Sequence, residues 1–301
     1  MHKPHFPLSA LRAFALLLLC AFPAVAQERL TTLDVRVRSE ISQVRGKVSL
    51  FAKNLDTGES YAFNPDDRVR TASTIKLPIL VAVHTLVAEG KVKWDDPLLL
   101  TEAKKVKGAG ILMEFGEGLK LTMRDAVNLM VAISDNTATN LVLDAITADA
   151  VNERIEALGL KQTRSLRKIG GGGASRAGSD PANQGFGIGV STPREMVNLI
   201  EKIERGEVVS PAASKEMIEL LKRQQYRDGI GRRLLGVDLA AKPGALDRLR
   251  SEVGILFTPR GRIAMAMTID DMPEIAWTVD NPGLLLISRL SEILAEGLGR
   301  P

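Results

Sequence analysis

The sequence predicts an α/β domain of the α+β type, in which an antiparallel sheet flanked by helices carries an inserted all-helical lobe. Strand-like segments occur near both ends of the chain, segments with helical spacing fill the middle, and no internal repeat is present. Within a domain covering 27–301, residues 27–72 and about 209–301 would form the α/β lobe, and residues 73–208 the helical lobe. A site is then expected in the crevice between the lobes.

The first 26 residues have the pattern of a cleavable export signal. Lys3 and Arg12 precede an apolar run over 13–26, which ends in Ala24-Val25-Ala26. This run is shorter than the roughly 20 residues of a membrane-spanning helix, and no later stretch is long enough. We therefore expect a periplasmic or secreted protein with no membrane span after cleavage.

The composition excludes several classes of function. The single cysteine, Cys20, lies in the signal region, so the mature chain has no disulfide, thiol nucleophile or thiolate metal site. Two of the 40 Lys and Arg residues lie there as well, which leaves 38 basic against 36 acidic residues, and aromatic residues make up 4%. This balance gives no reason to expect nucleic-acid binding. Nothing argues against a monomer, which we expect.

The expected order of elements begins with a helix and a hairpin. Residues 33–44 place apolar side chains at helical spacing, and strands are expected at 48–54 and 60–63. The segment Asp56-Thr57-Gly58-Glu59 between these strands is typical of a hairpin turn.

Helical spacing then continues through most of the chain. Helices are expected at 75–88, 122–133, 137–146, 151–158, 193–203 and 212–224. The glycine-rich stretch 169–189 is a long loop, of a length typical of functional or disordered segments. Strands at 253–257 and 263–269, joined by a turn at 258–262, and a helix at 284–298 complete the order.

Ser73 and Lys76 are a candidate nucleophile and base. They are three residues apart at the start of a helix, so they share a face. An ammonium with the usual pKa of about 10.4 cannot accept the serine proton, but burial and a second cation would lower that pKa. Lys242 is the candidate cation. The free N–H groups of the first helical turn can bind a developing oxyanion.

Two further motifs follow in the chain. Ser134-Asp135-Asn136 falls at a break between two helical segments, where a helix cap is the simpler explanation. Lys242-Pro243-Gly244 precedes the last strands. Each motif alone is weak evidence for an active site, and the prediction rests on the occurrence of all three in this order.

With these three motifs, the hairpin Asp56-Thr57-Gly58 and Ser191-Thr192-Pro193 ahead of a helix, the chain resembles the penicillin-recognising serine hydrolases, most closely their class A β-lactamase branch. The resemblance covers nearly all of the mature chain. It implies a β-lactamase/transpeptidase-like fold and a hydrolase that opens β-lactam rings through an acyl-enzyme. Its substrate would be a small β-lactam or a D-alanyl peptide, and no metal or cofactor is expected.

The resemblance also implies a role for each matching residue. Ser73 would carry the acyl group, while Lys76 and Ser134 handle protons. The remaining matches would bind substrate. Asn136 would bind the substrate amide, and Lys242 would supply positive charge from the third motif, which also includes the substrate-binding Gly244. Ala245 would provide the second oxyanion N–H, and Arg250 would bind the substrate carboxylate.

The sequence departs from the family at the loop residue that activates water for deacylation. An ungapped count places this glutamate at Ile169 or Gly170, and no glutamate occurs between Glu156 and Glu195. Asp180 with Asn183 could stand in, or Lys76 could act a second time.

Pro243 is a second departure, because it removes a backbone donor and the hydroxyl that helps to hold the substrate carboxylate in the family. A proline in a strand is tolerated at an edge or a bulge, which suits a strand that lines an open cleft.

Two alternatives to a β-lactamase stay open. One is a D,D-peptidase or esterase that acylates without the loop glutamate, and the other is a non-catalytic protein that traps a β-lactam or cell-wall peptide. A Ser-His-Asp mechanism is excluded because His84 is the only histidine after the signal, and its apolar neighbours indicate a packing residue or a partly exposed helix position.

Overall fold

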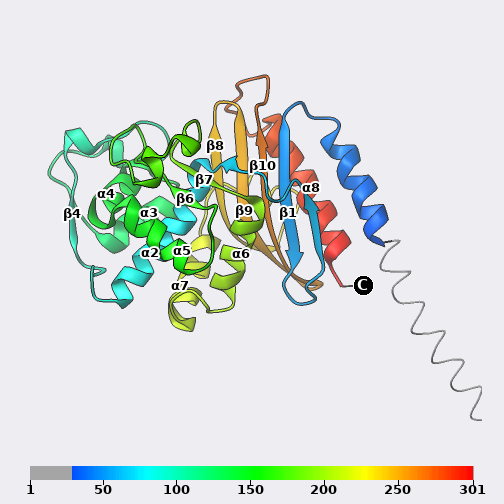
Figure 1. The fold of residues 1–301 in the computed structure, drawn as a ribbon, viewed down its shortest axis with the longest axis horizontal. Coiled ribbons are helices and arrows are strands. Elements are labelled where there is room, and N and C mark those ends of the chain that lie inside the picture. Colours follow the sequence, from blue (N-terminus) through cyan, green and yellow to red (C-terminus); the bar gives the residue numbers. More distant parts are fainter. Residues whose placement is uncertain (1–28, 301) are drawn as a thin grey trace, which may run out of the picture.

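The computed structural model describes residues 29–300 and has the predicted mixed architecture (Figure 1). An antiparallel sheet lies between the helical lobe on one face and α8 (Pro282–Leu298) with the N-terminal helix, which reaches residue 41, on the other. The predicted export signal and Cys20 lie outside the described residues.

Strands from both ends of the chain form the main sheet, in the order β2-β1-β10-β9-β8. All neighbours are antiparallel, and β1 pairs with β10 along its whole length, from Lys47↔Asp270 to Asn54↔Ile263. The five strands are β1 (Lys47–Asn54), β2 (Ser60–Phe63), β8 (Asp238–Leu246), β9 (Leu249–Thr258) and β10 (Gly261–Asp270). The predicted pairing of the first and last strands is therefore confirmed.

Side-chain alternation gives the sheet two different faces. Large residues such as Met265 and Met267 of β10 pack against α8, while Ala264 and Ala266 face the helical lobe. Small side chains on this inner face let α6 (Pro193–Glu204) lie close to the strands, and an ion pair from Lys53 of β1 to Glu201 joins them. Helices and sheet thus share one continuous core.

The helical lobe is built from helices whose ends carry local start signals. Thr122 forms a capping box with Asp125, and Ser210 with Pro211 begins the helix that follows α6. The helices are α2 (Lys76–Ala88), α3 (Met123–Ala132), α4 (Asn136–Ile146), α5 (Ala148–Ala157) and α7 (Pro211–Lys222). Minor elements are β3 (Val69–Arg70), β4 (Pro97–Leu99), β5 (Lys120–Thr122), β6 (Arg164–Ser165), β7 (Gly189–Ser191) and the 3-10 turns η1 (Ala72–Ile75), η2 (Glu102–Lys104), η3 (Leu112–Glu114), η4 (Ala177–Ser179) and η5 (Pro181–Asn183).

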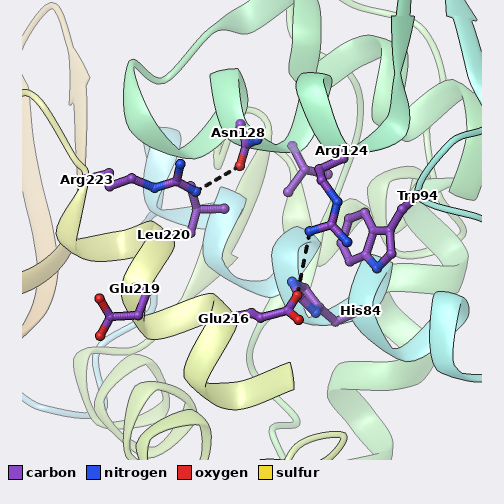
Figure 2. Close-up of a pocket in the computed structure, with 9 residues that line it drawn as sticks. His84, Trp94, Arg124, Asn128, Glu216, Glu219, Leu220 and Arg223 are labelled. Carbon is purple, nitrogen blue, oxygen red and sulfur yellow. Dashed lines mark hydrogen bonds and ion pairs between the residues drawn. The ribbon is translucent and has the colours of Figure 1, made fainter. Parts of the chain in front are cut away.

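His84 is a packing residue on α2, which is the first of the two positions expected for it. Its ring meets Trp94 edge to face with centroids 4.7 Å apart, and 6% of the residue is exposed. Both rings line a pocket of about 190 Å³ between α2, α3 and α7, with Arg124 stacked over Trp94 and facing Glu216 (Figure 2).

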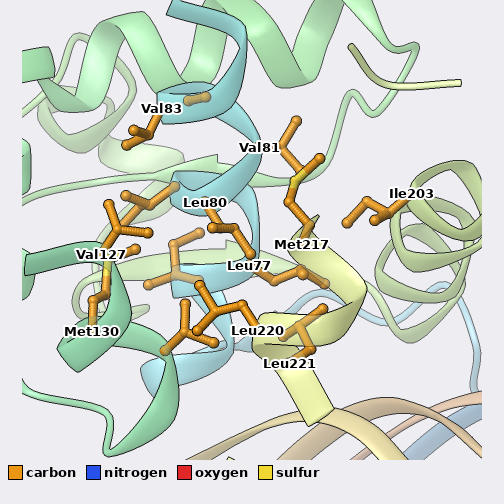
Figure 3. Packing of buried hydrophobic residues seen from close by; sticks show 14 of the residues in the cluster. Leu77, Leu80, Val81, Val83, Val127, Met130, Ile203, Met217, Leu220 and Leu221 are labelled. Atoms are coloured by element: carbon orange, nitrogen blue, oxygen red, sulfur yellow. The ribbon is translucent and has the colours of Figure 1, made fainter. Parts of the chain in front are cut away.

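Helix α2 is the centre of the helical lobe (Figure 3). Its residues from Lys76 to His84 are all buried, so this helix has no solvent face there. Leu77 and Leu80 pack among side chains of α3 and α7, including Met130 and Leu221. A helix that is apolar all round must be buried by its neighbours, and this burial fixes the start of α2 in space.

Candidate active site

Ser73 lies in η1, the 3-10 turn that leads directly into α2. The preceding residue, Ala72, has φ +47°, a left-handed conformation that is strained for a residue with a Cβ. Ser73 is half-buried, and its hydroxyl makes no hydrogen bond with the residues that the structure describes. The strained turn therefore presents a free hydroxyl.

Gly244 lets the edge strand β8 approach this turn. A Cβ at that position would lie 2.9 Å from the Ser73 nitrogen and 2.8 Å from the Thr71 oxygen, distances that side chains do not tolerate. The third motif therefore packs against the first through backbone atoms.

Lys76 is fully buried and makes three hydrogen bonds to the second motif. Its Nζ lies 2.7 Å from the Ser134 carbonyl oxygen, 3.2 Å from Ser134 Oγ and 3.0 Å from Asn136 Oδ1. Lys76 does not hydrogen-bond to Ser73 in this structure, because its amine is turned toward these three oxygens. The predicted base thus lies in the site, joined to the second serine.

Ser134-Asp135-Asn136 combines the predicted cap with a place in the site. Asp135 caps α4 by accepting from Ala138 N at 2.8 Å, and it also accepts from Ile111 N and Leu112 N. These bonds hold Ser134 in a left-handed conformation, φ +57°, with its side chain toward the lysines. The cap is what orients the motif.

Lys242 approaches the same hydroxyl from the sheet. Its Nζ lies 3.0 Å from Ser134 Oγ and 3.0 Å from the Pro243 carbonyl oxygen, and the residue is fully buried. Ser134 Oγ therefore lies between two buried lysine amines, one on α2 and one on β8.

The electrostatics of this cluster favour an uncharged Lys76. Burial lowers the pKa of Lys76 well below its ordinary value, and the nearby charge of Lys242 lowers it further, against a smaller raising effect of Asp135. Burial also lowers the pKa of Lys242, which the carboxylate of Glu252 opposes. Two buried ammonium groups sharing one serine cannot both keep their protons easily.

Pro243 lies in an edge strand, as its residue type predicts. The two-residue turn Asp247-Arg248 makes Leu246↔Leu249 a hydrogen-bonded pair, so every second pair along the ladder is not hydrogen-bonded. Pro243 and Ala245 fall at those alternate positions. The missing N–H of Pro243 therefore costs no ladder bond, and the Ala245 N–H points away from β9.

Arg250 is placed differently from its predicted role. Only 3% of the residue is exposed, and its guanidinium donates to the carbonyls of Leu246 and Leu249 at 2.7 Å and to the Ala276 carbonyl. It also lies over the ring of Trp277, 4.8 Å from the centroid. Arg250 braces the tip of the β8–β9 hairpin and is not a free fork for a carboxylate, so its role in substrate binding stays a prediction that this geometry does not favour.

The candidate substitutes for the loop glutamate do not join the lysine cluster. Asp180 is exposed and caps η5 by accepting from Ala182 N, while Asn183 is held by Arg68 and by the Ala177 carbonyl. Their hydrogen bonds lie within the loop and to Arg68. The structure thus gives Asp180 and Asn183 a structural part in the loop.

Ile169 is the loop residue that lies next to the second motif. Asn140, one turn after Asn136 on α4, donates from Nδ2 to the Ile169 carbonyl at 2.9 Å and accepts from the Ile169 N–H at 3.0 Å. The position counted for the family's glutamate is therefore fixed beside the site, and it carries an apolar side chain.

Glu252 is a buried acid near the site that sequence reasoning missed. It faces Pro243 across the β8–β9 ladder, and 1% of it is exposed. In the sequence, Glu252 is visible only as a charged residue just before an apolar segment. The strand expected to start at 253 leaves this residue outside the sheet.

In residues 29–300 no three metal-ligating side chains cluster, and no helix there is long and apolar enough to cross a membrane.

Comparison with known proteins agrees with this geometry. The beta-lactamase enzyme family model matches residues 32–298. Beta-lactamase 3 of Bacillus cereus is 23% identical over 72% of this chain and 67% of its own, and the beta-lactamase regulatory protein BlaB of Streptomyces cacaoi is 22% identical over 71% and 81%.

Solved structures give the same result for the fold. A beta-lactamase from Sphaerobacter thermophilus superposes with a TM-score of 0.77 and 29% identity, over 89% of this chain and 98% of that one. PBP-A superposes with a TM-score of 0.75 and 27% identity, over 88% and 95%. A variant of PBP-A was solved as an acyl-enzyme complex with penicillin G.

Proposed function

The chain belongs to the beta-lactamase enzyme family, and we propose that it is an exported, monomeric serine hydrolase that opens β-lactam rings through an acyl-enzyme on Ser73. One observation carries the proposal. The Ser134 hydroxyl lies 3.2 Å from Lys76 Nζ and 3.0 Å from Lys242 Nζ, beside a strained turn that presents Ser73. No histidine is needed in such a site.

In the acylation step, Ser73 Oγ attacks the carbonyl carbon of the ring while the neutral amine of Lys76 takes its proton. Rotation of the Ser73 side chain toward Lys76 must precede this, since the two groups are not hydrogen-bonded at rest. As the carbonyl–nitrogen bond breaks, Ser134 passes its proton to the departing nitrogen and receives the one held by Lys76. The products of this step are a neutral Lys76 and an ester on Ser73.

The developing oxyanion has two backbone donors in reach. Gly244 brings β8 against η1 at Ser73 N, and the Ala245 N–H points away from the ladder. We infer that these two N–H groups form the oxyanion site. Asn136, whose Nδ2 donates to the Lys107 carbonyl at 3.1 Å, and Lys242 then contact the substrate amide and carboxylate.

Release of the acyl group is the weak step. Ile169 occupies the loop position fixed against α4, and within residues 29–300 no carboxylate hydrogen-bonds to Lys76 or Lys242. We therefore propose slow hydrolysis, in which Lys76 itself activates the water. The same observation favours a second candidate, a D,D-peptidase acting on D-alanyl peptides. A variant of PBP-A, which is a structural neighbour, was solved as an acyl-enzyme complex with penicillin G.

Mass spectrometry of the purified protein mixed with penicillin, followed over time, separates these functions. A Ser73 adduct that forms and decays with turnover supports a β-lactamase, and a persistent adduct supports the peptidase or a trapping protein. Ser73→Ala is the control and should form no adduct. If wild type also forms none with penicillin or with a D-alanyl ester, acyl transfer at Ser73 is rejected.

A further inference from the structure

Glu252 lies on the opposite face of the edge of the sheet from Lys242. Lys242 pairs with Val253, which faces the helical lobe, so the neighbouring Glu252 points to the α8 side. There its Oε2 accepts from Ile230 N at 2.9 Å. Glu252 and Lys242 therefore lie on adjacent paired strands, with their side chains on opposite faces of the sheet.

This carboxyl group is short of partners for a buried charge. Glu252 Oε1 is buried and has no hydrogen-bond partner among the described residues. Gly229 makes room for the group, because a Cβ there would lie 1.9 Å from Oε2 and 3.2 Å from Ile287 of α8. An ordinary structural carboxylate would be expected to have more donors.

The charged groups around Glu252 point to Lys242 as its main counterion. Burial raises the pKa of Glu252, and the Ile230 N–H and Lys242 oppose that effect. The loop before β8 adds Asp228 and Arg227, which act in opposite directions, and α8 contributes the apolar Ile287.

We propose that Glu252 is a positioning residue that holds the charge on Lys242 from behind the strand, and through Lys242 keeps Lys76 uncharged. This inference rests on the function proposed above. The carboxylate favours the proton on Lys242, and the resulting charge disfavours a proton on Lys76. A buried lysine without this carboxylate would release its proton at lower pH and lose its attraction for an anionic substrate.

The test is the pH profile of Ser73 acylation by penicillin in Glu252→Gln. Glutamine still accepts from Ile230 N but carries no charge. The alkaline limb, which reports charged Lys242, should move down by about 1 pH unit, whereas the acid limb, which reports neutral Lys76, should stay in place because burial raises the pKa of Glu252 to about 7 and the group is already protonated there. A purely structural Glu252 would lower the rate at every pH and leave both limbs in place, which would overturn the proposal.

Glu201→Gln is the matched control. Glu201 of α6 is 7% exposed and pairs with Lys53 and Arg205, so its loss should leave both limbs unchanged. If wild type forms no adduct, the proposed function fails; if it does and the limbs of Glu252→Gln match wild type, only this inference fails.

A second measurement does not depend on the variant folding or on acylation. Wild-type protein labelled with ¹³C at the glutamate carboxyl should show one glutamate that titrates above the usual range yet is ionised by pH 8. A buried glutamate still protonated at pH 8 could not hold the charge on Lys242 and would refute the proposal.

Discussion

At the scale of single residues, the site depends on side chains whose charge is set by burial. Lys76 and Lys242 are both fully buried, and each lies about 3 Å from the same hydroxyl. In water either amine would be an ammonium, and neither could act as a base at neutral pH. The same burial that destabilises their charged forms makes Lys76 a usable base, so the chemistry and its cost in stability have one origin.

His84 allows a direct test of how burial shifts a proton equilibrium in this protein. Burial, helped by Arg124, lowers the pKa of His84 to about 4. Between pH 4 and about 6.5 the unfolded chain binds a proton that the folded chain does not, so stability rises with pH in this window. His84 should therefore cost the folded state about 3 kcal/mol as the pH falls from 7 to 4.

Urea unfolding of wild type and His84→Phe at a series of pH values measures this effect. The phenylalanine ring keeps the contact with Trp94 but cannot bind a proton, so the variant should lose that part of the slope. An equal slope in both proteins would show that His84 titrates normally.

At the scale of elements, the site exists because β8 and η1 touch through Gly244. In Gly244→Ala the new Cβ would lie 2.8 Å from the Thr71 oxygen, which forces the strand away from Ser73. Because a displacement of about 1 Å can cost 100-fold in rate, acylation should fall about 100-fold while the fold persists.

Gly116→Ala is the matched control for this substitution. Gly116 has no atom within 4 Å of its Cβ position and no left-handed backbone, so acylation by penicillin should be unchanged. A Gly244→Ala variant that acylates at the wild-type rate would show that close contact between β8 and η1 is dispensable.

The loop that carries Ile169 decides how long the acyl-enzyme lives. Asn140 fixes the backbone of Ile169 on both sides, so a new side chain there would start from a defined position. Ile169→Glu would supply the missing general base, and decay of the penicillin adduct should speed up by about 100-fold. Ile169→Gln has the same size without the base, and equal decay in both variants would contradict a general-base effect.

At the scale of the whole molecule, local patterns were sufficient to find the three motifs and to predict the order of the main elements, except for the edge strand β8. Helical spacing, capping residues and turn residues act over a few neighbours, which is why α6 and α7 begin at or beside their expected positions. Strand β9 begins at Leu249, four residues earlier than expected, because Arg250 and Glu252 are buried polar residues inside it.

Other features of the site depend on contacts between distant segments and were not predictable. The place of Glu252 behind Lys242 follows from strand pairing, and the bracing of Arg250 by the Ala276 carbonyl joins residues 26 apart. No local spacing shows that the guanidinium of Arg250, which was predicted to bind the substrate carboxylate, already donates to backbone carbonyl oxygens. The role predicted for Arg250 came from the family resemblance, which carried no information on this loop.

The two lobes should unfold as one unit, because the inner face of the sheet and the helices share a single core. Phe51, Val253 and Ile255 of the sheet belong to the same cluster as the side chains of α2, α3 and α7. The chain has two tryptophans, Trp94 in the helical lobe and Trp277 beside the sheet. Trp277→Phe leaves Trp94 as the only fluorescent tryptophan, and Trp94→Phe leaves Trp277. Urea unfolding of each variant, followed by tryptophan fluorescence, should therefore give a single transition. After correction for the change in stability that circular dichroism measures for each variant, the two curves of fraction unfolded should coincide. Fluorescence that precedes the circular dichroism transition in one variant would mean that its lobe opens first, and the site between the lobes would then be lost before the sheet.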